Sequence, residues 1–343
     1  MNISPKLILE GTDIFFENIQ LFGTKPIIII KKDVHDKFKN IIENIKNPNF
    51  YILKTDCSYE QANLILKTLT DETAVIGIGG GKVLDLAKLV AYRSQKKMIT
   101  VPTSAATGAA ASALSAIYTE DGANIGYELL NKAPDLLILD YALILDAPLD
   151  FLKFGAADAL AKYYETLAST AGSPENIFIQ TALDLATNIK NYIFQNLEMA
   201  LLAAKNKQLT NELKNIIKIN IILAPIVGGF GGESCRAVAA HALNNSMTQI
   251  PKMRKFLHGE VVALGNIFQL MLEKKMDELK KLKNLHKKIG LMEDFSYYKV
   301  KLKNSEIETL LAYLISEKET LNNMPQNFTK NSLRKHLKKL AIS

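Results

Sequence analysis

The chain has 343 residues, of which 48% are hydrophobic and 22% are charged, so it has the composition of a globular protein and not that of a disordered one. Because single domains usually span about 100–200 residues, the length predicts two domains. The formal net charge of +7 is compatible with nucleic-acid binding. However, the lysines gather in C-terminal amphipathic patterns such as MDELKKLKNLHKKIG, without interleaved aromatic residues or a nucleic-acid-binding motif. We therefore expect no nucleic-acid partner.

Neither a targeting segment nor a membrane anchor is predicted. The opening MNISPKLILE lacks the basic segment and apolar run of a signal peptide, and no uncharged apolar stretch reaches the roughly 18 residues of a transmembrane helix. Cys57 and Cys235 lie far apart and outside any CxxC pair, which predicts free thiols in a reducing compartment. We expect a soluble, cytoplasmic protein with no membrane partner.

Strand and helix patterns alternate over residues 1–149. Short apolar runs predict strands at 25–32, 50–55, 73–80, 97–103 and 135–140. Amphipathic patterns between them predict helices, for example over 59–70 and 81–92. This alternation predicts an α/β dinucleotide-binding domain in which helices cover both faces of a parallel sheet.

Strand patterns end near Pro148, and residues 150–343 show helical patterns only. Turn-forming segments interrupt them, namely AGSP (171–174), APIVGGFGGE (224–233) and QIPK (249–252). We therefore expect an all-α second domain over 150–343, with a ligand cleft between the two domains.

A run of three glycines, Gly79 to Gly81, joins the predicted strand at 73–80 to a helix that begins near Lys82. Glycine permits close backbone approach, and a helix N-terminus presents unpaired N–H groups, so a pyrophosphate would fit here. The loop matches neither the Walker A motif nor GxGxxG, and glycines also serve tight turns. Both readings, a phosphate loop and a plain turn, stay open on this motif alone.

The segment PTSAATGAAASALSAIYTEDG (102–122) is unusually poor in bulky side chains. Only Leu114, Ile117 and Tyr118 supply bulk, whereas a packed helix would place larger apolar residues at helical spacing. We interpret the segment as the lining of a space that is filled by something other than the protein core.

Two of the five histidines lie in segments suited to metal binding. His241 lies in an alanine-rich helical pattern, and His258 lies at the start of the next predicted helix, so that both rings could face one point. Asp158, which we place at a helix beginning after Gly155, would supply a carboxylate, and zinc accepts two imidazoles and one carboxylate with a position left for substrate. The alternative is that Asp158 is a helix cap and both histidines are core residues. The other histidines lie beside lysines and acids and are predicted at the surface: His35, His286 and His336.

Seven segments, in order, resemble the iron- and zinc-containing alcohol dehydrogenase superfamily, particularly its glycerol-dehydrogenase-like branch. They are GIGGGKVLDLAK, VPTSAAT, SALSAIYTEDG, APDLLILD, GAADALAKYYE, AAHALNNSMT and KFLHGEVVALG, and together they extend over nearly the whole chain. The resemblance implies a dehydroquinate synthase-like fold: a Rossmann-like N-terminal domain for a nicotinamide cofactor and a helical domain for a metal, in an oxidoreductase that is commonly oligomeric.

By this resemblance, Asp158, His241 and His258 match the metal ligands, and three ligands are more typical of zinc than of iron. Zinc would polarise a substrate carbonyl while the cofactor exchanges hydride with its carbon. The residues expected to line the cofactor are Gly80, Gly81, Lys82, Asp85, Thr103, Ser104, Ser112, Leu114 and Tyr118.

Three departures from the family bear on the substrate, on a proton relay and on the cofactor. Gly108 occupies the position of an aspartate that contacts the polyol in glycerol dehydrogenases, so the site loses both an acceptor for glycerol and a negative charge. Arg236 could then bind a substrate carboxylate, or else form a helix-end salt bridge. Asn244 replaces a histidine of many relatives, so a proton relay at that position is not expected.

Lys31 and Lys32 end an early strand, where a basic residue accommodates the 2′-phosphate of NADP and an acidic one binds the ribose of NAD. We favour NADP(H), although the adjacent Asp33 keeps NAD open.

We therefore predict a metal-dependent NAD(P)(H) oxidoreductase that acts on a small 2-oxo or 2-hydroxy carboxylic acid, with glycerol dehydrogenase as the alternative. The tail NNMPQNFTKNSLRKHLKKL and the run ATGAAASALS resemble the hydroxycarboxylate branch. A carbocycle-forming lyase related to dehydroquinate synthase is less favoured, because no basic cluster for a phosphorylated substrate is evident. A protein that only binds nucleotide is disfavoured by the three ligand-type residues.

Overall fold

The computed structural model describes residues 3–174, 176–235 and 237–342, which form two compact units. The first unit ends at Phe151 and the second begins at Leu152. Each unit has a buried core of its own.

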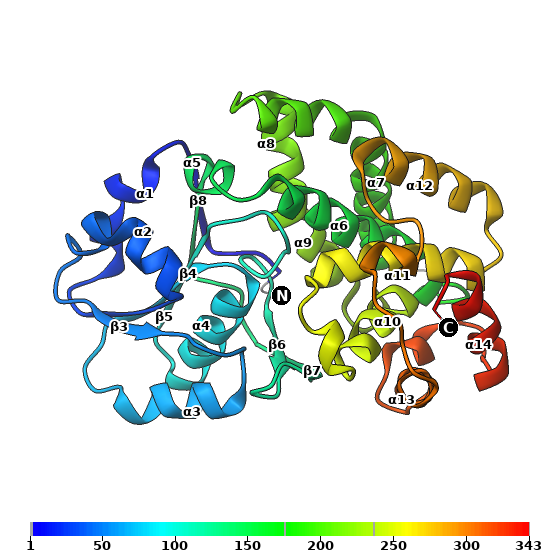
Figure 1. Cartoon of the computed structure of the whole chain (residues 1–343). Helices are drawn as coiled ribbons and strands as arrows, with labels where there is room; N and C mark the ends of the chain where they lie inside the picture. The colour runs from blue at the N-terminus through cyan, green and yellow to red at the C-terminus, as the bar shows by residue number, and fades with distance from the viewer. Residues whose placement is uncertain (1–2, 175, 236, 343) are drawn as a thin grey trace. The chain divides into compact units, whose positions relative to one another are not determined.

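The first unit contains a six-stranded parallel sheet (Figure 1). Its strands in spatial order are β1 (Leu7–Gly11), β8 (Leu136–Asp140), β5 (Lys97–Pro102), β4 (Ala74–Gly79), β2 (Pro26–Ile30) and β3 (Asn49–Ile52). Every residue of β2, β4 and β8 is buried, which explains why these strands are continuous apolar runs in the sequence. All five predicted strands are confirmed. The short edge strand β1, which pairs only with β8, was not predicted.

Helices cover both faces of this sheet, as predicted. They are α1 (Ile14–Glu17), η1 (Ile19–Phe22), α2 (Lys32–Ile42), α3 (Tyr59–Thr68), α4 (Gly81–Ser94) and α5 (Tyr141–Leu145). Alternate residues of β2 face opposite layers. Ile27 and Ile29 pack in a core cluster with residues of α3 and α4, whereas Ile28 and Ile30 pack with Phe15 of α1 and residues of α2.

The strand order reverses between β2 and β4. The chain runs from β2 outward to β3 and then returns to form β4 on the other side of β2. In open α/β sheets, ligands bind at the carboxyl ends of the strands at such a switch point. Ile30 pairs with Ile78, so the segments after both residues leave the sheet at this edge. Lys31 and the glycine loop therefore begin beside each other at the switch point.

A two-stranded antiparallel hairpin completes the first unit and was not predicted. It consists of β6 (Leu114–Tyr118) and β7 (Asn124–Leu129), with a register irregularity between Ile117 and Tyr118. Its residues alternate between more buried and more exposed positions. The exposed positions include the apolar side chains of Ile125 and Tyr127, where a polar residue is usual. The apolar periodicity that identifies a strand is therefore weak here.

The regular elements of the second unit are all helices among its described residues, in agreement with the prediction (Figure 1). Its elements include α6 (Leu149–Ser169), α7 (Ile177–Lys205), α8 (Asn211–Lys218), η2 (Ile219–Leu223), α9 (Ala224–Gly231), η3 (Gly232–Ser234), α10 (Ala239–Thr248), η4 (Pro251–Met253), α11 (His258–Leu272), α12 (Met276–Ile289), η5 (Phe295–Tyr298), α13 (Asn304–Leu314), η6 (Thr320–Asn323) and α14 (Lys330–Lys339). The stretch Asn211–Gly231 is long and apolar enough to cross a membrane by length and composition alone, and half of its most apolar window is buried inside the protein.

Small residues bring α6, α10 and α11 into close contact. A Cβ atom on Gly265 of α11 would overlap the carbonyl oxygen of Ala240 in α10, and one on Gly259 would overlap the carbonyl oxygen of Phe154 in α6. The alanine-rich pattern around His241 thus accommodates a neighbouring helix. Gln269 of α11 joins the three helices, because its Nε2 donates to the carbonyl oxygen of Tyr164 at 2.9 Å and its Oε1 accepts from the Ala240 N–H at 3.4 Å.

Two predictions about single side chains can be compared directly with the structure. Cys57 and Cys235 are free thiols, as predicted, and both are buried. The prediction that His286 lies at the surface is wrong, because its side chain is fully buried in the last turn of α12. The lysines around it occupy the polar face of that helix, while His286 falls on the apolar face.

Candidate functional site

Asp158 lies in the interior of α6, so its predicted place at a helix beginning is wrong, and so is the alternative of a helix cap. The helix already begins at Leu149 and runs through Gly155 without interruption. A glycine inside a helix costs only about 1 kcal/mol relative to alanine. Gly155 is buried inside the helix together with Ala156 and Ala157, so it does not mark a boundary.

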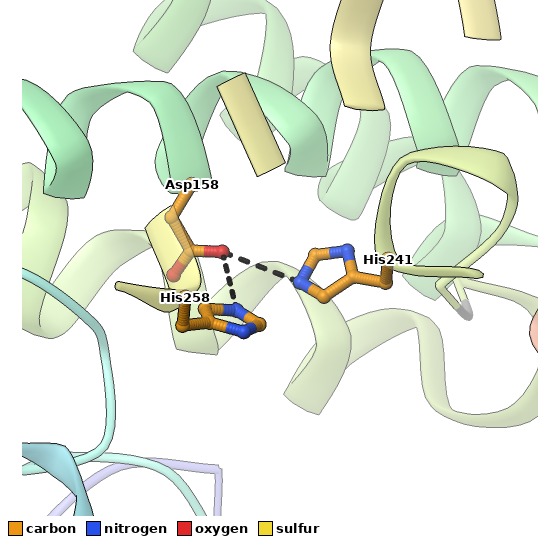
Figure 2. Close-up of side chains that lie close together, drawn as sticks. All are labelled: Asp158, His241 and His258. Carbon is orange, nitrogen blue, oxygen red and sulfur yellow. Dashed lines mark ion pairs between the residues drawn. The ribbon is translucent and has the colours of Figure 1, made fainter. Parts of the chain in front are cut away.

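The structure brings Asp158, His241 and His258 together, although they come from three helices (Figure 2). The Nε2 atoms of His241 and His258 lie 3.3 and 3.4 Å from the same oxygen of Asp158, Oδ1. One ligand atom from each of the three side chains lies within 4.8 Å of the others. His258 is the first residue of α11, as predicted, and Figure 2 shows both rings turned toward the carboxylate.

The charges of this cluster depend on one another. Burial alone would raise the pKa of Asp158, but the nearby rings of His241 and His258 hold that pKa well below its usual range. Burial likewise opposes protonation of His241, yet the nearby carboxylate of Glu165 raises the pKa of this imidazole to about 9. The buried carboxylates therefore require positive charge beside them, which protons supply when no metal ion is present.

The cluster also fits a divalent cation by its donor atoms. Asp158 Oδ1 is buried and has no well-aligned hydrogen-bond partner among the described residues. A buried acceptor left in this state is costly, and a cation would satisfy it. One carboxylate oxygen and two imidazole nitrogens form a donor set that is common for zinc.

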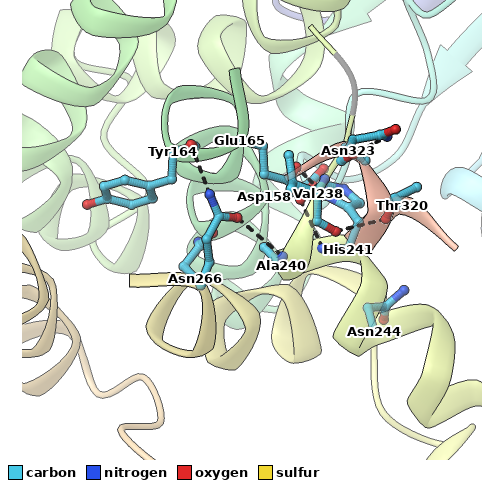
Figure 3. A network of polar contacts seen from close by, with 12 residues as sticks. Asp158, Tyr164, Glu165, Val238, Ala240, His241, Asn244, Asn266, Thr320 and Asn323 are labelled. Atoms are coloured by element: carbon cyan, nitrogen blue, oxygen red, sulfur yellow. Dashed lines mark hydrogen bonds and ion pairs between the residues drawn. The ribbon is translucent and has the colours of Figure 1, made fainter. Parts of the chain in front are cut away.

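Glu165 was not predicted and is part of the same cluster (Figure 3). It is 1% exposed, and its Oε2 lies 2.6 Å from Nδ1 of His241. Its Oε1 accepts hydrogen bonds from the backbone N–H groups of Val238 at 2.8 Å and His241 at 3.0 Å. Asp158 and Glu165 share one face of α6, because residues seven apart lie two helical turns from each other. That spacing is the sequence signal that could have identified Glu165.

Asn244 contacts the ring of His258, and η6 holds the segment that leads into α10. The side-chain amide of Asn244 lies 3.0 Å from Nδ1 of His258. From η6, Thr320 Oγ1 donates to the carbonyl oxygen of Val238 and Asn323 Nδ2 donates to that of Ala237, each at 2.8 Å (Figure 3). The segment that leads into α10 is thus held by η6 as well as by Glu165.

The glycine loop of the first unit has the geometry of an anion-binding helix start. Gly80 is the N-cap of α4 and supplies no side-chain cap, and its carbonyl oxygen accepts from the N–H groups of Val83 and Leu84 at 3.1 Å each. The earlier N–H groups, of Gly81 and Lys82, precede the first intrahelical bonds. Thr103, which follows β5, donates its backbone N–H to the carbonyl oxygen of Gly79 at 3.1 Å, so it lies beside the loop.

Other residues predicted to line the cofactor surround this loop. Lys82 Nζ forms an ion pair with Asp56 at 2.5 Å and lies 5.4 Å from the centre of the Tyr118 ring. Ser104 is buried, and its Oγ would be 3.9 Å from a Cβ atom on Gly80. Lys32 is exposed and pairs with Asp36 at 2.8 Å.

A buried lysine that was not predicted, Lys88, organises the segment of small residues. Its Nζ forms an ion pair with Asp85 at 2.9 Å and donates to Ser112 Oγ at 2.8 Å and to the carbonyl oxygen of Leu114. Ser112 and Leu114, expected to face the cofactor, thus also anchor the loop to α4. Gly108 lies in the same loop, and its carbonyl oxygen accepts from the N–H groups three and four residues further on, at Ala111 and Ser112. Arg236, the other residue expected to contact substrate, lies outside the described residues.

A glycine loop at the switch point of a parallel sheet, together with a cluster of metal-ligand side chains, is typical of an enzyme that uses a dinucleotide and a divalent metal.

Residues 6–141 match the sequence model of the family "Iron-containing alcohol dehydrogenase". Hydroxycarboxylate dehydrogenase A of Escherichia coli (strain K12) is 34% identical over 273 residues, which are 79% of this chain and 75% of that protein. Glycerol dehydrogenase of Thermotoga maritima is 30% identical over 348 residues, which are 95% of this chain and 93% of that protein. The crystal structure of glycerol dehydrogenase from Schizosaccharomyces pombe superposes with a TM-score of 0.87 at 25% identity, and covers 98% of this chain and 89% of that one.

The chain belongs to the iron-containing alcohol dehydrogenase family. It is therefore an NAD(P)-dependent alcohol dehydrogenase-like oxidoreductase of a metal-dependent family, and it acts on a small-molecule substrate. The resemblance noted in the sequence and the predicted fold class are both confirmed.

Proposed function

We propose that the protein is a zinc enzyme that interconverts small 2-oxo acids and 2-hydroxy acids with NADP(H), and that Asp158, His241 and His258 hold the metal. The observation that carries the metal assignment is the convergence of three ligand atoms within 4.8 Å on a buried carboxylate oxygen that lacks a hydrogen-bond partner among the described residues. Three protein ligands leave one position of a tetrahedral zinc site for substrate.

When bound, the metal would polarise the substrate oxygen and the nicotinamide would exchange hydride with the substrate carbon. The residues of the chain supply position and charge. Asp158 contributes the negative charge among the three proposed ligands. Glu165 holds the ring of His241 through Nδ1, and Asn244 contacts the ring of His258 through Nδ1.

The substrate class rests on Gly108. An aspartate at this position would repel an anionic substrate, and glycine adds neither charge nor an acceptor for a polyol hydroxyl. The similarity to a hydroxycarboxylate dehydrogenase supports this choice. The second candidate is a glycerol dehydrogenase, which the longer match to the Thermotoga maritima enzyme favours.

The preference for NADP(H) rests on Lys31. This residue follows β2 directly at the switch point, and its side chain is not engaged in an ion pair with any described residue. A cation at this place complements the 2′-phosphate of NADP. Asp33 is exposed in the first turn of α2 and is the nearest candidate for an NAD ribose contact.

The test is oxidation of NADPH and NADH by the zinc-loaded protein with 2-oxoglutarate, oxaloacetate, 2-oxobutyrate and dihydroxyacetone. We expect the highest kcat/KM with a 2-oxo acid and NADPH. Gly108→Asp should reduce the 2-oxo acid rate much more than the neutral, equally large Gly108→Asn. Preference for dihydroxyacetone would return the protein to the glycerol branch, and preference for NADH would overturn the cofactor choice. No consumption of either cofactor would favour the lyase alternative.

A further inference from the structure

Glu165 supplies the cap that α10 lacks in its own sequence. The N-cap residue of α10 is Val238, whose side chain cannot accept a hydrogen bond, and no side-chain cap is formed there. Glu165 Oε1, from α6, instead accepts the N–H groups of Val238 and His241. A carboxylate at this position also complements the partial positive charge of the helix N-terminus. The first turn of α10, which carries His241, is therefore held by a residue of another helix.

The second oxygen of Glu165 determines which nitrogen of His241 carries a proton. An ionised carboxylate only accepts hydrogen bonds, so Nδ1 of His241, at 2.6 Å from Oε2, must donate. In the neutral imidazole the other nitrogen, Nε2, is then unprotonated and has a free lone pair. That nitrogen lies 3.3 Å from Asp158 Oδ1, on the side where the ligand atoms converge.

The two histidines are held differently. The amide of Asn244 faces Nδ1 of His258 and can present either its oxygen or its nitrogen to the ring. It therefore does not select one tautomer of His258. His258 is also the more exposed of the two, with 30% of its side chain accessible against 13% for His241. His241 is consequently the preset ligand of the cluster.

We propose that Glu165 is the positioning residue of the metal centre: one carboxylate both places the first turn of α10 and selects the tautomer of His241 that can bind a metal ion. The inference rests on the proposed metal ligands. It assigns Glu165 no contact with metal or substrate. Carboxylates that orient a ligating histidine typically contribute about ten- to hundredfold to metal affinity.

The decisive variant is Glu165→Gln. Its amide has one acceptor atom and one donor atom, so it can accept hydrogen bonds either from the two backbone N–H groups or from Nδ1–H of His241, but not from both. If the oxygen caps α10, the amide N–H₂ faces Nδ1 and favours a proton on Nε2, which blocks metal binding. If the amide turns round, it places a donor against two backbone donors. Glu273→Gln is the matched control, because Glu273 is a buried carboxylate of the same unit that pairs with Lys275.

The measurement is the zinc affinity of the full chain by competition with a chelator, together with the melting temperature of the metal-free protein. We expect zinc affinity about ten- to hundredfold weaker for Glu165→Gln, as for other such partners, and unchanged affinity for Glu273→Gln. Glu165→Ala should weaken zinc binding and also lower the melting temperature further than Glu165→Gln does, since it loses the cap as well.

Zinc affinity of Glu165→Gln within about twofold of the wild type would overturn the inference while leaving the ligand set intact. A wild-type protein that binds no zinc would overturn the ligand set itself. If the variants fail to fold, ¹⁵N chemical shifts of the histidine rings in the wild-type zinc protein decide the question. We expect the proton of His241 on Nδ1, and a metal-bound Nδ1 would refute the proposal.

Discussion

His286 should make the stability of the protein depend on pH in mildly acidic solution. Its side chain is fully buried at the end of α12, and Nδ1 lies 2.6 Å from the carbonyl oxygen of Met292, to which it donates. The other ring nitrogen, Nε2, is buried without a hydrogen-bond partner among the described residues. A proton there would create a buried charge. Burial therefore lowers the pKa of His286 from 6.5 to about 4, and the positive charge of Lys283 acts in the same direction.

The sign and size of the effect follow from this pKa. Below pH 6.5 the unfolded chain binds a proton at His286 that the folded chain does not bind until about pH 4. The free energy of unfolding therefore decreases as the pH falls through this interval. Above the interval His286 is neutral in both states, and the full stability is present. At about 1.36 kcal/mol for each pH unit, the loss amounts to roughly 3 kcal/mol by pH 4.

The comparison that isolates this residue is wild type against His286→Asn. The asparagine amide can still donate to the carbonyl oxygen of Met292, but it does not titrate. Thermal melts between pH 7.5 and 4, in the presence of a chelator so that the metal centre is equal in both proteins, should show about 3 kcal/mol more destabilisation of the wild type. Parallel loss of stability in the two proteins would refute the argument that burial keeps His286 neutral.

Two further substitutions test the packing that positions the site. Lys88→Met removes one partner of a buried ion pair and three hydrogen bonds to the segment of small residues, so it should cost about 3–5 kcal/mol in urea unfolding and weaken NADPH binding. The exposed Lys67→Met in α3 is the control, and a loss below about 1 kcal/mol for Lys88→Met would contradict its role. Gly265→Ala should force α10 and α11 apart at Ala240, at a cost of about 1–3 kcal/mol, and should weaken zinc binding measured by chelator competition. Gly228→Ala, where a Cβ atom meets nothing within 4 Å, should leave zinc affinity unchanged. Equal effects of the two glycine variants would show that close helix packing does not position the metal ligands.

The parts of the fold that could be predicted are those with a strong local pattern. Buried parallel strands such as β2 and β4 are continuous apolar runs between turn residues, and they are evident without tertiary information. The edge strand β1 and the hairpin β6–β7 are partly exposed and mix polar with apolar residues. Their pairing depends on neighbours distant in sequence, so no local pattern identified them.

Errors about single residues have the same origin. Asp158 was placed at a helix beginning because Gly155 and small residues precede it, but α6 runs through these buried residues without a break. His286 was placed at the surface because its sequence neighbours are lysines, whereas its position on the helix directs it inward.

The sequence by itself determined the strand–helix alternation, the glycine loop after a buried strand, the candidate metal ligands and the family to which the chain belongs. Only the tertiary structure decided that Asp158 meets both histidine rings through one oxygen, and that Glu165 contacts the ring of His241. Spacing along one helix fixes which residues share a face, as for Asp158 and Glu165. The meeting of α6, α10 and α11 depends instead on side-chain volume at their contacts, and that is settled only when all three helices pack together.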